Sequence, residues 1–425
     1  MSRWRWILRQ VTKRLWLRAS LIGSLGVAAA IIAAVAERYI PWELPGTIGA
    51  AAVDSILAII ASSMLAVTTF SLNVMTAAFS AATNNVTPRA TRLLMEDRVT
   101  QNVLSTFIGS FLFSIVGIIV LKTGAYGDRG RVVLFIVAIG VIALIVFSLL
   151  RWIDHLMQLG RVGETTDRVE RATEEAIRLR MKEPYLGGVP LREAGGKAGM
   201  AVSAQRVGYV QFVDMPALSR CAEALECDID LGVIPGTFVY PDTVLSRLGH
   251  EVAMESGQQE RVEAAMRSAF SIGDSRSFDQ DPRFGLAVMC EIGSRALSAA
   301  INDSGTAIDV IGRLTRLMSM FAPGPDRKAD DEFLYPRVHV PVLKSADLFE
   351  DAFMPLGRDG AGLIEVQLRL QKALFALSRM GDEDFRKAAL FQSELALKRA
   401  QDAFTLDADL ERLREAMHRA RGFAD

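Results

Sequence analysis

The 425-residue sequence has little cysteine, little histidine and little charge. Its three cysteines, Cys221, Cys227 and Cys290, are odd in number and lack C-x-x-C spacing, so we expect neither a disulfide framework nor a zinc site. The four histidines are scattered without the spacing of metal ligands. The net charge of −1 provides no basic excess to displace phosphate counterions, which argues against a nucleic-acid partner.

Enzyme signatures are also missing. The sequence contains no P-loop, no G-x-S-x-G nucleophile elbow, no H-E-x-x-H zinc motif and no kinase signature. No nucleophile, base or metal set can be named from it. We therefore expect a protein that is not an enzyme and that carries no cofactor.

Charge is absent from four long stretches in particular. With 23% charged residues and a mean hydropathy of +0.24, the chain is too apolar for an ordinary soluble protein of its length. The stretches without Asp, Glu, Lys or Arg are Ala19–Ala36, Ser55–Val86, Val99–Leu121 and Val132–Leu150. Each reaches the roughly 18 to 20 residues that a helix needs to cross about 30 Å of hydrocarbon. We predict a four-span transmembrane domain in residues 1–153.

The flanks of these stretches predict an orientation. Six basic and no acidic residues precede the first stretch, whereas the next connection, ERYIPWELPG, holds one arginine and two glutamates. By the positive-inside bias, the N-terminus and, after four spans, the C-terminus are expected in the cytoplasm. Trp4, Trp6 and Trp16 are typical of interfacial anchors, and with the long basic region they argue against a cleaved secretory signal.

Charged residues return after Arg151 and indicate a second, water-exposed half. Residues 154–199 combine a charged amphipathic helix with a Gly- and Pro-rich linker, and residues 200–250 alternate β-like runs with one helix. Residues 251–425 show helical spacing throughout. The predicted fold is mainly α: a four-helix transmembrane domain, followed by a cytosolic α+β domain with a small sheet and a C-terminal helical bundle.

One apolar stretch carries an unusual number of polar side chains. In TFSLNVMTAAFSAATNNVT, residues 69–87, they recur in steps of four and three, which places them on one face of a helix. The members of this polar stripe are Thr69, Asn73, Thr76, Ser80, Thr83 and Thr87. The helix is too long for one bilayer, so we expect it to end before Pro88, with Thr87 as the N-cap of a following helix.

Two explanations fit the polar stripe. Hydroxyls and small side chains let membrane helices pack closely and hydrogen-bond to a neighbour. Alternatively, several copies of the helix surround an axis, and the stripe lines a water-filled pore. Because an unpaired amide or hydroxyl in hydrocarbon is costly, exposure of the whole stripe to lipid is excluded. Six groups in register exceed what one partner helix needs, which favours a homo-oligomer.

Other membrane segments carry small residues at helical spacing. The third predicted span has Thr106, Ser110, Ser114 and Gly117 along one face, and the first has Gly26-x-x-x-Ala30. Such patterns let helix backbones approach closely. We interpret both as packing surfaces rather than functional sites, with the third span as the packing partner of the stripe.

The segment RALSAAINDSGTA, residues 295–307, predicts a corner between two helices. The first helix would end near Ala300, and a polar residue after it would cap the second. The corner can be purely structural, or it can form a small-molecule or ion site that regulates the membrane part. The residues of that candidate ligand site are Asp281, Arg295, Asn302 and Asp303.

Two segments carry a family resemblance. FSLNVMTAAFSAATNNVTPRATRLLMEDRVTQNVLSTFIGSFLFSI and, far downstream, FDQDPRFGLAVMCEIGSRALSAAINDSGTA resemble the bacterial membrane proteins grouped as domain of unknown function 2254. The matching positions include Pro88-Arg89, Asp97-Arg98, Gln280-Asp281-Pro282 and Asn302-Asp303; Ala299 and Ser304 stand where the family often has proline. The resemblance implies an inner-membrane location in bacteria and a cytosolic C-terminal domain, but no established activity.

Two functions fit the sequence. The first is an oligomeric ion channel or pore-like transporter, lined by the second span, surrounded by the lipid bilayer and regulated by its cytosolic domain through ions or a small cytosolic ligand. The second is a membrane-anchored sensor or scaffold that binds a ligand or protein and transports nothing. We favour the channel because the polar stripe is long and regular.

Overall fold

The computed structural model describes residues 3–12, 15–36, 49–95, 97–124, 128–158, 161–191, 199–324 and 333–422. The chain forms two compact units. We call residues Ile7–Asn84 and Thr91–Thr165 the membrane unit, and Met1–Trp6, Asn85–Ala90 and Thr166–Asp425 the C-terminal unit. The first predicted connection, from residue 37, and much of the predicted linker lie outside the described residues.

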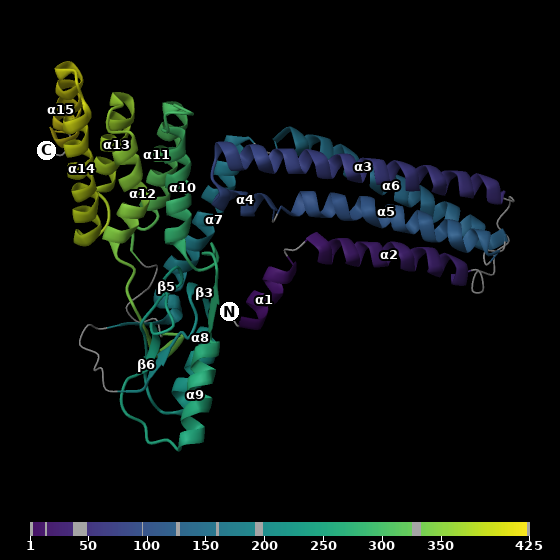
Figure 1. The fold of residues 1–425 in the computed structure, drawn as a ribbon, viewed down its shortest axis with the longest axis horizontal. Helices are drawn as coiled ribbons and strands as arrows, with labels where there is room; N and C mark the ends of the chain where they lie inside the picture. The colour runs from purple at the N-terminus through teal and green to yellow at the C-terminus, as the bar shows by residue number, and fades with distance from the viewer. Residues whose placement is uncertain are drawn as a thin grey trace. The chain divides into compact units, whose positions relative to one another are not determined.

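Four long helices that run alongside one another make up the membrane unit (Figure 1). They are α2 (Leu15–Ala36), α3 (Ala50–Asn85), α5 (Arg98–Lys122) and α6 (Asp128–Gln158). Three contain segments long and apolar enough to cross a membrane: Ala50–Ala81, Arg98–Lys122 and Gly130–Met157. The apolar stretch described in α2, Trp16–Ile32, is shorter, so a fourth span stays a prediction.

Helix α5 is closely packed because glycines allow its backbone to approach α2. A Cβ atom added at Gly26 would lie 2.6 Å from the Gly109 carbonyl oxygen, and one at Gly109 would lie 2.9 Å from Ile22 Cγ2. Leu57 from α3, Phe113 from α5 and other apolar side chains fill a buried core nearby. The small residues of the first and third predicted spans therefore serve packing, as predicted; the partner of α5 at this contact is α2.

The C-terminal unit contains two small sheets. The five-stranded sheet has the order β1 (Gly188–Pro190), β8 (Tyr335–Val340), β4 (Ile229–Leu231), β6 (Val244–Leu248), β2 (Ala201–Ser203). The three-stranded sheet has the order β5 (Phe238–Val239), β3 (Gly208–Val213), β7 (Phe270–Gly273). Strand β8 is parallel to both neighbours, and the other pairs are antiparallel.

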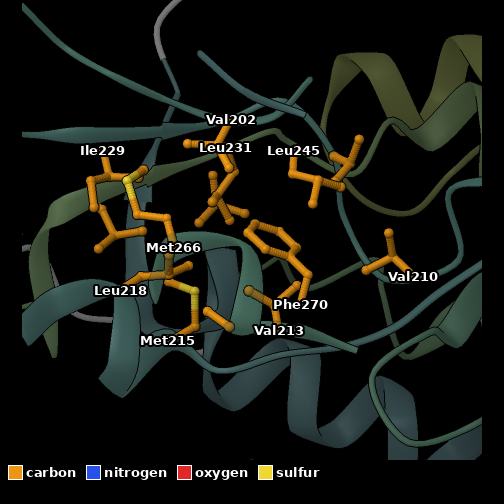
Figure 2. Packing of buried hydrophobic residues seen from close by; sticks show 14 of the residues in the cluster. Val202, Val210, Val213, Met215, Leu218, Ile229, Leu231, Leu245, Met266 and Phe270 are labelled. Carbon is orange, nitrogen blue, oxygen red and sulfur yellow. The ribbon is translucent and has the colours of Figure 1, made fainter. Parts of the chain in front are cut away.

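A single apolar core joins the two sheets to two helices (Figure 2). Leu231 from β4 and Phe270 from β7 are buried in it together with Leu218 of α8 (Met215–Ala224) and Met266 of α9 (Ser256–Ser268). Burial of such side chains, at roughly 25 cal/mol per Å² of apolar surface, is the main force that holds short strands together.

Helices make up the rest of the C-terminal unit and stand side by side in Figure 1. They are α7 (Val162–Lys182), α10 (Pro282–Ala296), α11 (Ser304–Ser319), α12 (Ser345–Asp359), α13 (Ile364–Leu377), α14 (Glu383–Ala403) and α15 (Asp407–Gly422), with a 3₁₀ turn η1 (Pro184–Gly187). On α11, Arg313 bonds to Asp167 and Glu170 of α7, and Arg316 also bonds to Glu170.

Two details differ from the sequence predictions. Strands β7 and β8 come from residues 251–425, which were predicted to be helical throughout. Strand β7 pairs with β3, and strand β8 pairs with β1 and β4, all of which are distant in sequence. The helical periodicity of the flanking segments therefore concealed both strands from sequence analysis. The amphipathic helix predicted after residue 154 is also divided, because α6 extends to Gln158 and α7 begins at Val162.

Two upstream segments belong to the C-terminal unit. Trp6, on α1 (Arg3–Thr12), is buried, stacks on Phe212 at 5.3 Å between ring centroids, and donates a hydrogen bond to Asp279 Oδ2 at 2.9 Å. This corrects its assignment as an interfacial anchor, whereas Trp4 is exposed. Residues 85–90, which include the start of α4 (Pro88–Met95), form the second segment.

Candidate functional site

Helix α3 buries one face within the membrane unit. Its buried side chains recur in steps of three and four residues, the spacing of a single helical face. They are Val53, Leu57, Ile60, Ala61, Met64, Thr68 and Ser71. This face supplies α3's contribution to the apolar core of the unit.

The polar stripe lies on the opposite side of α3. Thr69, Asn73, Thr76 and Ser80 are exposed, and Thr83 is half-buried. At about 100° per residue, Asn73 is roughly 180° around the helix from the buried Met64. The stripe is therefore not used to pack α3 against the other described helices of its own chain.

The stripe's threonines satisfy their hydrogen-bond donors within α3. Thr69 donates to the Leu65 carbonyl at 2.9 Å, and Thr76 donates to the Leu72 carbonyl at 2.9 Å. Thr83 repeats this pattern one heptad later, at 2.8 Å. These bonds remove most of the expected cost of exposing the three threonines to hydrocarbon, so the argument against lipid contact depends on the other members of the stripe.

Asn73 is the exception within the stripe. Its side chain is exposed, and the described residues offer it no hydrogen-bond partner. A primary amide carries two N–H donors and a carbonyl acceptor, and a helix cannot satisfy all of them with its own backbone. Asn73 is thus the residue of the stripe that most needs water or another polar group.

Thr87 does not belong to the stripe. Helix α3 ends at Asn85, and Thr87 is buried in the C-terminal unit, where its hydroxyl donates to Glu291 Oε2 at 3.0 Å. Arg89 pairs with the same carboxylate at 2.8 Å. The cause is Pro88, which disfavours helical backbone at the preceding residue and begins α4. The predicted helix start at Pro88 is confirmed. Without Thr87, the predicted pore-lining set has five members, all on α3.

Asp281, the first residue of the candidate ligand site, is a buried helix cap. Its carboxylate accepts a hydrogen bond from the Phe284 backbone at 3.1 Å and two from Arg276, at 2.7 and 3.0 Å. Gly236, at φ +96°, packs directly against the same carboxylate. Burial raises the pKa of Asp281, and the charge of Arg276 opposes the rise. Its oxygen atoms are already engaged in holding the start of α10.

The other three residues lie at the far end of α10. Arg295 is in the last turn, so the helix rise of about 1.5 Å per residue puts it about 20 Å from Asp281. Asp303 caps α11 and accepts from Thr306 N at 2.9 Å; the Thr306 hydroxyl lowers the pKa of Asp303. Asn302 has φ 51° at the turn. The structure therefore does not bring the four residues into one site, and it shows the corner that the sequence predicted.

Sequence reasoning missed a polar cluster in the membrane unit. His155 Nε2, at the end of α6, lies 2.8 Å from Asp97 Oδ2, and both side chains are nearly buried. Asp97 is the N-cap of α5 and also accepts hydrogen bonds from Thr100, at 2.8 Å from the backbone and 2.6 Å from the hydroxyl. Asp97 before an apolar run signals a cap, but no sequence signal links it to His155. The cluster fixes the ends of α5 and α6 together.

The C-terminal unit also contains a cavity of about 560 Å³ that sequence reasoning did not identify. Arg180 of α7 lines it together with side chains from η1, the ends of α11 and α12, and α14. Among the residues that the structure describes, no cluster of His, Cys, Asp and Glu could hold a metal ion. The cavity and the outward face of α3 are two surfaces of the described residues with functional potential.

Comparisons with known proteins identify the family. A family model described as predicted membrane protein, domain of unknown function 2254, matches residues 12–376. Uncharacterised proteins of Mycobacterium bovis and Mycobacterium tuberculosis are 27% identical over 258 residues, which covers 60% of this chain and 49% of theirs.

The chain thus spans about half the length of these curated relatives. No solved structure matches the chain. Since the family model covers most of the sequence, including the polar stripe, α10 and the corner at Asp303, the chain belongs to the domain of unknown function 2254 family of predicted membrane proteins.

Proposed function

We propose that the chain forms a homo-oligomeric channel in the inner membrane, in which the outward face of α3 from each copy surrounds a polar path for ions. The observation that carries this proposal is Asn73, an exposed amide inside an apolar segment of Ala50–Ala81 with no described partner. An unpaired amide in hydrocarbon costs about 2 kcal/mol or more, so association that brings it to water or to another copy is favourable.

The hydrogen bonds of the stripe favour a cation over an anion. A threonine hydroxyl that donates to its own backbone can only accept further hydrogen bonds or coordinate a cation. Thr69 and Thr76 are both in this state. The path would therefore present these acceptor oxygens about two helical turns apart, with the Asn73 amide between them. The proposal assigns the chain no catalytic step.

The C-terminal unit can regulate the proposed pore through the chain segment that directly follows α3. The chain passes from α3 at Asn85 directly into residues that pack in the C-terminal unit, where Thr87 and Arg89 both bond to Glu291 of α10. A change at α10 would thus act on the residues that immediately follow the proposed pore helix. The cytoplasmic placement of this unit and of both termini belongs to the same proposal.

Ion flux from reconstituted liposomes tests the channel. We expect the native chain to release a monovalent cation and Asn73→Leu to reduce the flux at least tenfold. The matched control is Ser63→Leu, an exposed α3 position about 80° around the helix from Asn73. Absence of flux in the native chain, or equal flux from both variants, would contradict the channel.

The satisfied threonines favour a second candidate. A stripe whose hydroxyls bond to their own helix can face lipid, and the chain would then be a membrane-anchored sensor or scaffold with a ligand- or protein-binding C-terminal unit. This candidate predicts a monomer in nanodiscs and no flux. Mass photometry of nanodisc-embedded protein separates it from the oligomer that the channel requires.

A further inference from the structure

The cavity in the C-terminal unit is lined by a buried cation, Arg180, that forms no ion pair within the described part of the chain. Arg180, in the last turn of α7, is 8% exposed, and burial lowers its pKa to about 10, so it remains protonated at neutral pH. Its single hydrogen bond to the described residues goes from Nη2 to the Gln280 backbone oxygen at 3.1 Å. The acidic group that acts on Arg180, Asp281, already accepts two hydrogen bonds from Arg276.

A buried guanidinium in this state is expensive. Charged side chains inside proteins are normally paired, and an arginine has five N–H donors to satisfy. Here one donor is satisfied by a backbone carbonyl, and Arg180 is one of the residues that line the cavity. A carboxylate or phosphate placed in that space would supply the missing charge and accept two hydrogen bonds from the guanidinium.

The remaining cavity walls are suited to an apolar body. Phe321, Val342, Leu343, Leu348 and Phe385 all line the space. Leu348 and Phe385 are buried, so the surrounding core holds these two wall residues in place. A volume of about 560 Å³ is within the range of pockets that hold small molecules.

The other polar groups at the cavity do not replace an anionic ligand. The Asp382 carboxylate caps α14 by accepting from Phe385 N at 2.9 Å. Helix α12 begins beside the cavity at Ser345, and its N-cap, Lys344, makes no side-chain capping bond. The first-turn N–H groups of α12 therefore add partial positive charge at this wall of the cavity.

The 3₁₀ turn η1, which forms one wall of the cavity, has a strained backbone. Tyr185 and Leu186 in η1 both have left-handed backbone, at φ 55° and 57°. Two successive non-glycine residues in this region cost free energy and persist where the surrounding structure holds them. Tyr185 lines the cavity, so the strain shapes the wall beside Arg180.

We propose that this cavity binds an amphiphilic anion, with a carboxylate or phosphate on Arg180 and a hydrocarbon body against the apolar wall. The proposal does not depend on the channel. It replaces the ligand site predicted around Asp281 and Asp303 with one centred on Arg180. The anion can be a free fatty acid or acyl phosphate, or the head and part of a chain of an anionic lipid.

Binding to the full chain in nanodiscs of zwitterionic lipid tests the proposal. Isothermal titration with dodecanoate is compared with dodecanol, which has the same chain without the charge, and with inorganic phosphate, which has charge without the chain. We expect dodecanoate to bind at least tenfold more tightly than either. Equal binding by dodecanol would contradict the proposed contact between Arg180 and the anion. Equal binding by phosphate would contradict the proposed contact between the hydrocarbon chain and the apolar wall.

Variants locate the site. Arg180→Gln should weaken dodecanoate binding by about ten- to hundredfold, the value of a charge-assisted hydrogen-bond pair. The control Arg178→Gln, two residues away and bonded on the surface to Glu174, should leave binding unchanged. Ala322→Trp fills the cavity and should abolish binding while Arg180 is kept. Unchanged binding in both Arg180→Gln and Ala322→Trp would overturn the assignment.

The thermal stability of the ligand-free variant separates binding from a structural role. Removing an uncompensated buried charge should leave the melting temperature unchanged or raise it. A large drop in Arg180→Gln would mean that the arginine holds the fold through Gln280, and would overturn the proposal. Repeating the measurement in nanodiscs with anionic lipid identifies the source: an Arg180-dependent stabilisation without added dodecanoate assigns the anion to the bilayer.

Discussion

Helices α3 and α5 carry similar polar patterns in opposite environments. Both place hydroxyl and small side chains at steps of three and four residues. On α5 this face is buried inside the membrane unit, and on α3 it is exposed. Spacing therefore identifies which residues share a face, whereas the surroundings decide whether that face packs within the chain or awaits a partner.

The two helices also differ in what stabilises them. Ser114 of α5 is fully buried, and its hydroxyl has no hydrogen-bond partner among the described residues. Close approach to α2 at Gly109 holds this helix in place. On α3 the exposed hydroxyls of Thr69 and Thr76 are satisfied by their own helix. Packing fixes α5, and hydrogen bonding within the helix lets α3 expose a polar face.

The largest expected effect comes from Gly109→Leu. The new side chain would meet Ile22 across the α2–α5 contact, where a Cβ alone lies 2.9 Å from Ile22 Cγ2. We expect a loss of about 3 kcal/mol or more in the free energy of unfolding, or failure to fold. The control is Gly140→Leu on α6, where nothing lies within 4 Å of the added Cβ. Equal thermal stability of the two variants in detergent would contradict the claim that close packing against α2 holds α5 in place.

A smaller effect is expected from Asp97→Ala, which removes both the α5 cap and the His155 contact. We expect a loss of about 2 kcal/mol, since a buried acceptor with several partners is removed. Asp154→Ala, at an exposed site near the same end of α6, is the control and should change stability by less than about 0.5 kcal/mol. Chemical denaturation of the two variants measures the difference.

The smallest effect is expected from Thr76→Val on the exposed face of α3. Its hydroxyl bonds to the Leu72 carbonyl, which is already bonded within the helix, so its loss should change stability by less than about 0.5 kcal/mol. Thr106→Val on α5 is the matched variant, because its hydroxyl makes the same kind of bond, to the Asn102 carbonyl at 2.9 Å. It should cost more because Thr106 is buried and the new side chain must fit a packed contact. If Thr76→Val were the more damaging, α3 would already be packed in the folded chain.

Much of the fold was predictable because helical periodicity is local. Three of the predicted spans correspond to helices long and apolar enough to cross a membrane, and Asp303 and Thr87 stand at helix starts. The helical spacing predicted for residues 251–425 corresponds to α9 to α15, interrupted by β7 and β8. Strand β8 was missed because its identity depends on β1 and β4, far away in sequence. Sequence patterns record the period of an element but not its distant partners.

The candidate sites were predicted less well. The stripe from Thr69 to Thr83 was found because it depends on spacing within one helix. The grouping of Asp281 with Arg295 was wrong because α10 holds them at opposite ends, with Asp281 at its N-cap and Arg295 in its last turn. The cavity at Arg180 could not be found from sequence, since its walls come from five segments that only the folded chain brings together.

Cysteine cross-linking in native membranes tests most directly whether copies of the chain meet through the outward face of α3. In a background with Cys221, Cys227 and Cys290 replaced by alanine, Asn73→Cys is compared with Phe147→Cys, a 64% exposed position on α6. We predict rapid oxidative cross-linking into dimers at position 73 but not at 147. Monomers at both positions, or equal cross-linking at both, would contradict the account.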